Sequence, residues 1–372
     1  MNEFELIEQI FLQLQADQPL PTDIEKGIGD DAAVMSLPAG SRLVSCVDTL
    51  VQGRHFNADW PQVQQLAFAI GYKAVAVNVS DLAAMGATPH SILLALALPE
   101  RLANQAWLTE FAKGLFHACQ LFGVTLIGGD TTRNDSLILS ISAQGLLPAD
   151  TPAVYRSGAK VGDKVYVSGS LGDAAYALQH PDNGVGIELA HRLHMPTPRI
   201  QLGIALAQIG ATAMIDISDG LYQDLSHICQ QSKVSMRLNI EQLPTSTPLS
   251  TIGLTERLLC QLTGGDDYEL AFTLPADVAP PLNNTSISCI GEVIAVANQV
   301  DITTTDFTAT DSEVKDSKAT GFKVAGSEVT DSTKNIVSPH PVLFYQGQAV
   351  TPTQPSPFTT WPTLTGYQHF AG

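Results

Sequence analysis

The feature that most constrains this chain is a set of aspartates in short segments rich in Gly, Ser or Thr. The 372-residue sequence contains six of them: GIGDD (27–31), DT (48–49), SD (80–81), GGDTT (128–132), DISDG (216–220) and GGDD (264–267). A single Asp at a turn is ordinary, because its side chain can hydrogen-bond to nearby backbone. Six such segments predict a fold that gathers carboxylates in one place. Neighbouring carboxylates repel one another unless cations lie between them.

Carboxylate oxygens suit Mg²⁺, which is commonly held by a few carboxylates together with the phosphates of a substrate. The Gly-rich segments favour the same chemistry, because they let backbone N–H groups approach a phosphate. Arg133 and Arg156 are scarce cations beside these segments and are candidates for phosphate contacts. The sequence therefore predicts Mg²⁺-dependent phosphate chemistry. The alternative for any single segment is local capping; Asp219, for example, could simply cap a helix that begins near Leu221.

Composition argues against several function classes. The net charge of −18 makes nucleic acid a poor partner. No apolar run approaches the roughly 18 residues of a membrane helix, and the acidic start of the chain does not resemble a signal peptide. The five cysteines are odd in number and form no C-x-x-C pair, which favours reduced thiols in the cytoplasm. The sequence contains no P-loop, kinase-type catalytic loop or H-E-x-x-H motif.

Apolar periodicity predicts a mixture of helices and strands. Helices are expected over residues 4–14, 66–81, 107–122 and 198–209, and from 173 and 221 onward. Strands are expected over residues 43–47, 91–98, 124–127, 136–147, 164–168, 213–217, 268–273, 286–290 and 342–345. In this interpretation Asp48 and the GGD of 128–130 each follow a strand. His191 and His194 are expected at the surface, because no other metal ligands accompany them.

The segment 148–152 resembles a linker, so the sequence predicts an α+β protein of two domains, 1–148 and 149–372. Most of the aspartate segments fall in the first domain. Within the second, residues 301–340 are rich in Ser, Thr and acidic side chains with little apolar periodicity, which predicts a low-complexity insertion. The aromatic tail GYQHF (366–370) is expected to fold back onto a site.

Seven motifs carry a family resemblance along nearly the whole chain: GIGDDAAV (27–34), DTLVQGRHF (48–56), YKAVAVNVSDLAAMGATP (72–89), LIGGDTTR (126–133), RSGAKVGD (156–163), IDISDGLYQDLSHI (215–228) and GGDDYEL (264–270). Their order and spacing resemble the thiamine-monophosphate kinase family, within the aminoimidazole-ribonucleotide-synthetase-like ATP-binding superfamily. The resemblance implies two α+β domains, each a mixed sheet packed with helices, and a homodimer paired through the N-terminal sheets. It also implies the reaction, the last step of thiamine diphosphate synthesis: direct in-line transfer of phosphate from ATP to thiamine phosphate, assisted by several Mg²⁺ ions.

The resemblance further implies a set of metal ligands: Asp30, Cys46, Val47, Asp48, Asp81, Asp130, Asp216 and Asp219. Among these, Asp81 would bridge several ions, and Asp48, Asp81 and Asp130 would form the metal cluster at the phosphates. No covalent catalytic residue is implied. Cys46 departs from the Ser or Thr usual in the family. Because a thiol is a poor ligand for Mg²⁺, a backbone carbonyl or a water would serve there.

Contacts to the two substrates are implied in the same way. The ATP contacts are Gly129, Asp130, Arg156 and Ser218, with Phe111 as the nearest candidate for an aromatic beside the adenine. The acceptor contacts are His55, Asp266 and Tyr367. By spacing alone His55 is equally well a half-buried loop residue. Asp266 replaces the usual Glu, so a water would bridge it to the substrate, and Tyr367 would stack on a thiamine ring.

Two other functions stay open from the sequence. One is a different ATP-dependent enzyme of the same superfamily, but the reactive cysteine segments that such enzymes need are absent from this sequence. The other is a protein that binds nucleotide or thiamine phosphate without turnover. The departures at Cys46 and Asp266 favour the second, and the retention of the main metal aspartates argues against it.

Overall fold

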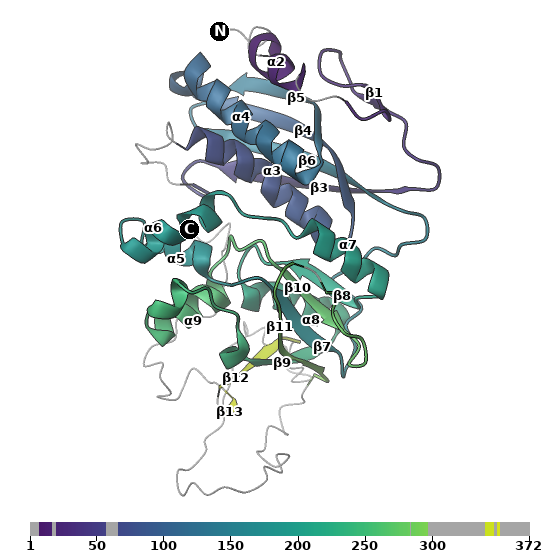
Figure 1. Cartoon of the computed structure of the whole chain (residues 1–372), viewed down its shortest axis with the longest axis vertical. Coiled ribbons are helices and arrows are strands. Elements are labelled where there is room, and N and C mark those ends of the chain that lie inside the picture. The colour runs from purple at the N-terminus through teal and green to yellow at the C-terminus, as the bar shows by residue number, and fades with distance from the viewer. Residues whose placement is uncertain are drawn as a thin grey trace, which may run out of the picture.

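Two sheets, one in each half of the sequence, organise the molecule (Figure 1). The computed structural model describes residues 7–16, 20–56, 66–282, 284–296, 339–345 and 348–349. Most of the 301–340 segment and all of the aromatic tail therefore lie outside the described residues. None of the described helices has both the length and the apolar character needed to cross a membrane.

The first sheet has four strands in the order β3-β6-β4-β5. Its strands are β3 (Arg42–Val51), β4 (Thr88–Leu98), β5 (Thr125–Arg133) and β6 (Ile138–Leu147). Strands β4 and β5 run parallel, and the other pairs are antiparallel. Along β6 each buried residue alternates with a half-buried one, as expected for a strand with one face on a core. Helices α3 (Ala67–Ala84) and α4 (Gln105–Phe122) form that core with the sheet.

Helix α3 is almost entirely buried and packs backbone to backbone against α4. A Cβ atom added at Gly71 would lie 2.1 Å from the carbonyl oxygen of Phe111, and one at Gly114 would lie 1.9 Å from that of Phe68. Only glycine permits such an approach, since any side chain would force the helices apart. The close packing fixes α3 firmly on the N-terminal half.

The second sheet has seven strands in the order β13-β12-β9-β11-β7-β10-β8. Its pairs are antiparallel except that of β12 with β9. The strands are β7 (Lys164–Ser168), β8 (Ala213–Asp216), β9 (Ser235–Asn239), β10 (Leu270–Leu274), β11 (Ile287–Ile294), β12 (Pro341–Tyr345) and β13 (Gln348–Ala349). The helices of this half are α5 (Asp173–Gln179), α6 (Gly184–His194), α7 (Ile200–Ile209), α8 (Leu221–Ser232) and α9 (Leu254–Thr263).

Smaller elements complete the described chain. The predicted N-terminal helix is observed as a π-helix, η1 (Ile7–Leu12), followed by α2 (Gln13–Ala16). Strands β1 (Ile24–Lys26) and β2 (Val34–Met35) flank the GIGDD segment as a two-stranded ribbon. Three 3₁₀ helices cover Glu100–Leu102, Ile240–Gln242 and Leu249–Thr251.

The two halves meet along α3. Near its C-terminal end a Cβ atom on Gly203 of α7 would lie 2.1 Å from the carbonyl oxygen of Ala83, so these two helices also touch through their backbones. Figure 1 shows α7 between the two sheets. On the same helix, Ser80 Oγ donates a hydrogen bond of 2.8 Å to Asp216 at the end of β8. Helix α3 is therefore the structural link between the halves.

Three predicted boundaries are wrong in a consistent way. Strand β3 continues through Asp48 to Val51, β5 contains the GGD segment instead of ending before it, and α3 runs past Asp81 to Ala84. In both strands a neighbour pairs with the whole length, so the ladder continues through residues with low β-propensity. These aspartates are therefore held by regular elements and not by turns.

Candidate active site

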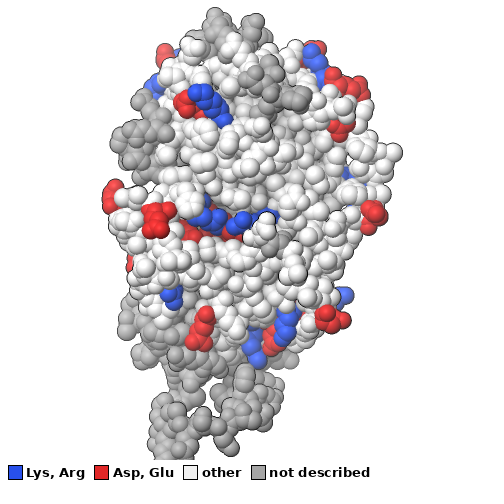
Figure 2. All heavy atoms as spheres, in the orientation of Figure 1, with Lys and Arg blue, Asp and Glu red and all other residues white. Residues whose placement is uncertain are grey.

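A cleft of about 970 Å³ lies between the halves. Its N-terminal wall consists of the end of β3, the loop that follows it and one face of α3, whereas its C-terminal wall includes residues of the DISDG and GGDD segments. In Figure 2 a hollow across the middle of the molecule contains acidic and basic side chains, while much of the surrounding surface is uncharged. Eight of the residues predicted at the site line this cleft: Asp48, His55, Asp81, Arg156, Asp216, Ser218, Asp219 and Asp266.

Three carboxylates from different elements influence one another in the cleft. Burial raises the pKa of Asp81 to about 8, with further contributions from the nearby carboxylates of Asp216 and Asp48. Burial likewise raises the pKa of Asp216 to about 6; Asp48 adds to this shift, and the hydrogen bond from Ser80 opposes it. The guanidinium of Arg156 lowers both pKa values. This part of the cleft therefore disfavours uncompensated negative charge and favours a cation.

Polar residues on α3 hold these carboxylates in place. The side chain of Asn78 accepts a hydrogen bond of 3.0 Å from the backbone N–H of Asp48 and donates one of 3.0 Å to the carbonyl of Ala74. Cys46 donates from Sγ to the carbonyl of Asn78 at 3.3 Å. Burial and the neighbouring Asp81 and Asp48 raise the pKa of the Cys46 thiol, so it stays protonated. The positioning roles of Asn78 and Ser80 were not predicted from the sequence, although two polar residues in the apolar stretch AVAVNVSD were a signal.

A single buried carboxylate shapes the DISDG segment. Oδ2 of Asp224 accepts hydrogen bonds from the backbone N–H groups of Ser218, Asp219 and Gly220 at 3.2, 3.2 and 3.1 Å. Helix α8 begins after Gly220 without a side-chain cap, so the alternative in which Asp219 simply caps this helix is wrong. By binding three consecutive N–H groups, Asp224 holds the DISDG segment in a tight turn, in which Asp219 lines the cleft.

The GGDD segment packs tightly against the DISDG segment. A Cβ atom on Gly265 would lie 2.2 Å from the carbonyl oxygen of Ser218, which explains why glycine is needed there. Behind the segment, both oxygens of Asp267 accept from the N–H of Gly172, at 3.1 and 2.9 Å. Glu269 is fully buried and binds both Arg192 and Arg199. These charged side chains fix the segment from the C-terminal half.

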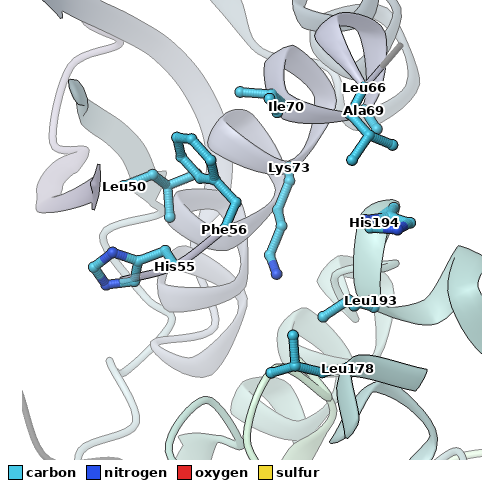
Figure 3. Close-up of a pocket in the computed structure, with 10 residues that line it drawn as sticks. All are labelled: Leu50, His55, Phe56, Leu66, Ala69, Ile70, Lys73, Leu178, Leu193 and His194. Carbon is cyan, nitrogen blue, oxygen red and sulfur yellow. The ribbon is translucent and has the colours of Figure 1, made fainter. Parts of the chain in front are cut away.

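A small apolar pocket adjoins the cleft and shares Leu50, His55, Phe56 and Leu178 with it (Figure 3). His55 Nδ1 accepts a hydrogen bond of 3.0 Å from the backbone N–H of Val51, which orients the ring. His194 also lines this pocket and is half-buried, so the prediction that it lies at the surface is wrong. Burial, followed by the charge of Lys73, lowers the pKa of His194 to about 4.

Several other predicted residues that the structure describes do not line the cleft. Asp30 is exposed and pairs with Lys26 at 3.5 Å. Gly129 and Asp130 lie on β5, the edge of the sheet opposite β3, and Asp130 is exposed. The side chain of Val47 is 64% exposed on the face of β3 opposite Asp48. Tyr367 lies outside the described residues.

Phe111 does not lie at the site. It is fully buried in the N-terminal core and stacks on Trp107, with 5.3 Å between the ring centroids. No surface of its ring is left for an adenine, so this expectation is corrected. The periodicity that identified its helix also marks Phe111 as a core position, which was the simpler interpretation.

The cleft fits Mg²⁺ by its donor chemistry. Among the described residues no three acidic, His or Cys side chains converge closely enough to enclose an ion by themselves. Magnesium does not require such a cage, because it usually keeps several waters and uses one or two carboxylates plus substrate phosphates. The oxygens of Asp48, Asp81, Asp216 and Asp219 provide carboxylates of this kind along one cleft.

Both halves of the chain match models of known protein families. Residues 29–147 match the family model of the AIR synthase related protein N-terminal domain, and residues 160–301 match that of the C-terminal domain. The chain is 40% identical over 308 residues to a thiamine-monophosphate kinase from Salmonella typhimurium, covering 79% of this chain and 91% of that protein.

Solved structures are also similar. A thiamine-monophosphate kinase from Stenotrophomonas maltophilia has a TM-score of 0.70 at 39% identity, covering 79% of this chain and 95% of the other. A structure of AaThiL complexed with AMPPCP and TMP has a TM-score of 0.61 at 31% identity, with coverage of 79% and 91%. With this identity over nearly the full length of its relatives, the chain belongs to the thiamine-monophosphate kinase family.

Proposed function

We propose that this protein phosphorylates thiamine phosphate with ATP, giving thiamine diphosphate and ADP. One observation carries the proposal: the cleft between the halves brings together Asp48, Asp81 and Asp216 from three separate segments, in a member of the thiamine-monophosphate kinase family. A related structure at 31% identity holds AMPPCP, an ATP analogue, together with TMP. The five free cysteines support a cytoplasmic location.

The acceptor in this reaction is already a nucleophile. A phosphate oxygen of thiamine phosphate is anionic near neutral pH, so transfer to it needs no strong general base. The new bond joins that oxygen to the γ-phosphorus as the bond to the β-phosphate oxygen breaks, and ADP leaves with the electron pair. The protein must therefore position two anions and offset their repulsion, and Arg156 at the edge of the cleft is suited to contact phosphate oxygens.

We assign the metal sites first to the carboxylates that line the cleft: Asp48, Asp81, Asp216 and Asp219. When bound, Mg²⁺ would neutralise phosphate charge and hold the phosphates in line. Cys46 would take part only through its backbone, because its protonated thiol is bound to Asn78. Val47 is assigned in the same way, since its side chain projects from the opposite face. Ser218, between two of the carboxylates, is assigned to ATP.

His55, Asp266 and Tyr367 are assigned to the acceptor. The first two line the cleft beside the apolar pocket, where a ring system of the acceptor would be shielded from water. The alternative of a purely structural loop histidine is less favoured for His55, since this residue lines both cavities. The role of Tyr367 rests on the family resemblance alone.

Asp30, Gly129 and Asp130 require a partner copy in this proposal. In one chain β5 and β3 are opposite edges of the sheet, separated by two strands, so Asp130 and Asp48 lie on the order of 14 Å apart. The outer face of the sheet carries a row from Val47 through Ser142 to Leu93, and Val47 and Leu93 are 64% and 38% exposed. We propose that a second copy covers this face and that its edge strand brings Asp130 to the site.

The test is turnover of thiamine phosphate with ATP and Mg²⁺, with thiamine diphosphate and ADP separated by chromatography. Stoichiometric formation of both products, abolished by EDTA, is expected. Release of ADP without thiamine diphosphate would show that the acceptor is another compound. Tight binding of both ligands without turnover would indicate a binding protein.

A further inference from the structure

Lys73 is a buried lysine that the reaction described so far does not use. It lies on α3, its side chain is 9% exposed, and its Nζ is 2.9 Å from Oδ1 of Asp266 in the GGDD segment. Lysine is rarely buried to this degree without a partner, because desolvating the ammonium costs free energy. Figure 3 shows the side chain extending from α3 into the small pocket, toward the side occupied by Leu178 and Leu193. The pair therefore joins the two halves across the cleft.

Asp266 is held in an unusual backbone conformation. Its backbone φ angle is +65°, and that of Tyr268 is +50°. Residues other than glycine rarely adopt this left-handed region. The N–H of Asp266 donates to Ser218 at 2.9 Å, and the hydroxyl of Tyr268 donates to Oδ1 of Asp266 at 3.1 Å. Such conformations persist only where the surroundings impose them, and they cluster at functional sites. The surroundings thus determine where this carboxylate lies.

Helix α3 sets the distance between the two ends of the site. Lys73, Val77 and Asp81 are spaced by four residues and so share one face of the helix. With a rise of about 1.5 Å per residue, Lys73 and Asp81 are separated by roughly 12 Å along the axis. The Asp81 end lies with Asp216 and Asp48, where phosphates are proposed to bind. The Lys73 end lies beside Asp266 and the apolar pocket, where the ring end of the acceptor would lie.

We propose that Lys73 is a positioning residue for recognition of the acceptor, an inference that rests on the proposed function. Lys73 and Tyr268 both bind Oδ1 of Asp266. Neither of these bonds uses Oδ2, which in this proposal accepts from an N–H donor of the acceptor ring directly and not through the water expected from the sequence. The aminopyrimidine of thiamine phosphate carries such a donor, its amine. Lys73 also offsets the charge of Asp266, so that this end of an acidic cleft does not attract Mg²⁺.

The test uses the full chain with Lys73→Met, which keeps the apolar stem and removes the charge. The KM for thiamine phosphate is expected to rise about tenfold, as for loss of a charged hydrogen bond. The KM for ATP should change less than about twofold, because the Asp81 end is untouched. Lys73→Arg should restore part of the loss, since arginine also binds carboxylates. The control is Lys113→Met, an exposed lysine on α4 that pairs with Glu110 and should leave every constant unchanged.

An analogue of thiamine phosphate with a carbonyl oxygen in place of the amine separates positioning from a general structural effect. The unmodified protein should prefer the amine by about tenfold or more in kcat/KM, and this preference should fall toward one in Lys73→Met. Asp266→Asn should behave similarly, and the double variant should be no worse than either single one. Three results would each overturn the proposal. The first is an unchanged preference for the amine in Lys73→Met, and the second is an equal rise in KM for ATP and for thiamine phosphate. The third is a double variant in which the effects of the two single substitutions multiply.

Two further measurements keep the result interpretable. If Lys73→Met does not fold, Tyr268→Phe removes only the hydroxyl that donates to Oδ1 of Asp266. This variant should weaken the preference for the amine by about threefold; an unchanged preference would count against the proposal.

Calorimetric binding of thiamine phosphate separates this inference from the proposed function. Binding without turnover in the unmodified protein would contradict the function alone, and the effect of Lys73→Met on that binding would still decide the inference. Absence of binding would overturn both.

Discussion

Ser80 on α3 donates a hydrogen bond of 2.8 Å to Oδ2 of Asp216 at the end of β8. Both side chains are buried, and they come from opposite halves of the molecule. The bond orients Asp216 relative to Asp81, the residue that follows Ser80. It therefore couples the geometry of the proposed metal site to the docking of the two halves.

Ser80→Ala should weaken both properties. Loss of a buried hydrogen bond to a charged group should lower the free energy of unfolding by about 1.5–3 kcal/mol. Turnover should fall by about tenfold, because Asp216 loses its orientation. Urea unfolding and steady-state kinetics measure the two effects. Ser250→Ala, at an exposed serine bound only locally to Thr247, serves as the control. If Ser80→Ala has the same free energy of unfolding as the unmodified protein, Ser80 does not link the two halves.

Asp81→Asn should remove most turnover and keep the fold. The substitution preserves shape but removes a charge that burial and two neighbouring carboxylates already disfavour. We expect kcat to fall by about a hundredfold or more, while the melting temperature without Mg²⁺ stays the same or rises. Asp182→Asn on the exposed surface is the matched control. Near-full activity of Asp81→Asn at saturating Mg²⁺ would exclude a bridging role.

The raised pKa values of Asp81 and Asp216 also predict a pH dependence. In the folded state these groups hold protons that the unfolded chain has released, between the ordinary pKa near 4 and about 8. Their contribution to stability is therefore fully present below about pH 4, declines as pH rises above this value, and is lost once pH has passed about 6 for Asp216 and about 8 for Asp81. In EDTA the melting temperature should fall over this range, and added Mg²⁺ should oppose the fall. If the melting temperature falls with pH at the same slope in the unmodified protein and in Asp81→Asn, these carboxylates do not cause the fall.

Asp224→Ala should weaken ATP binding, although Asp224 itself does not line the cleft. It leaves the N–H groups of Ser218, Asp219 and Gly220 without their shared acceptor. We expect the Kd for ATP with Mg²⁺ to rise by about tenfold or more, with a loss of stability of about 1–3 kcal/mol. Asp224→Asn should be milder, since an amide oxygen can still accept. Calorimetry with AMPPCP measures binding without turnover, and unchanged affinity would argue that the segment holds its shape alone.

Leu43→Asp tests the proposed pairing of sheets. Leu43 is 49% exposed on β3, on the same face as Val47. A carboxylate buried there in a dimer would be unpaired, so the variant should be monomeric by light scattering and should lose activity. Leu121→Asp places the same charge on an exposed leucine of α4 and should leave the assembly intact. If both variants elute as the unmodified protein does, this face is not the interface.

The sequence predicted elements well where local pattern and tertiary pairing agree. Strand β7 was predicted at its observed bounds, and the helices now seen as α4, α7 and α8 were predicted within a few residues. Helix α6 was missed because two glycines in its first turn hide its periodicity; the side chain of Asn183 supports its start by accepting from the N–H of Gly186.

The site was predictable in its chemistry but less so in its placement. Carboxylates in Gly-rich segments marked Asp48, Asp81 and Asp216, which the fold brings to one cleft. The pairing of Lys73 with Asp266 joins residues almost two hundred positions apart, so no local pattern indicates it. Asp30 and Asp130 share the same motif chemistry yet lie elsewhere. Asp130 is on β5 because the sheet order places that strand at the edge opposite β3, and Asp30 lies between the strands of the separate β1–β2 ribbon.

The backbone contact between Gly203 and Ala83 has a mechanical consequence. With no side chain between the helices, this point is suited to act as the fulcrum for rotation of one half against the other. Along α3 the fulcrum is about 3 Å from Asp81 and about 15 Å from Lys73. A rotation of about 10° would then move the first by roughly half an ångström and the second by more than about 2 Å. Such a rotation would open the site around the ring of an acceptor and would leave the contacts to its phosphate almost unchanged.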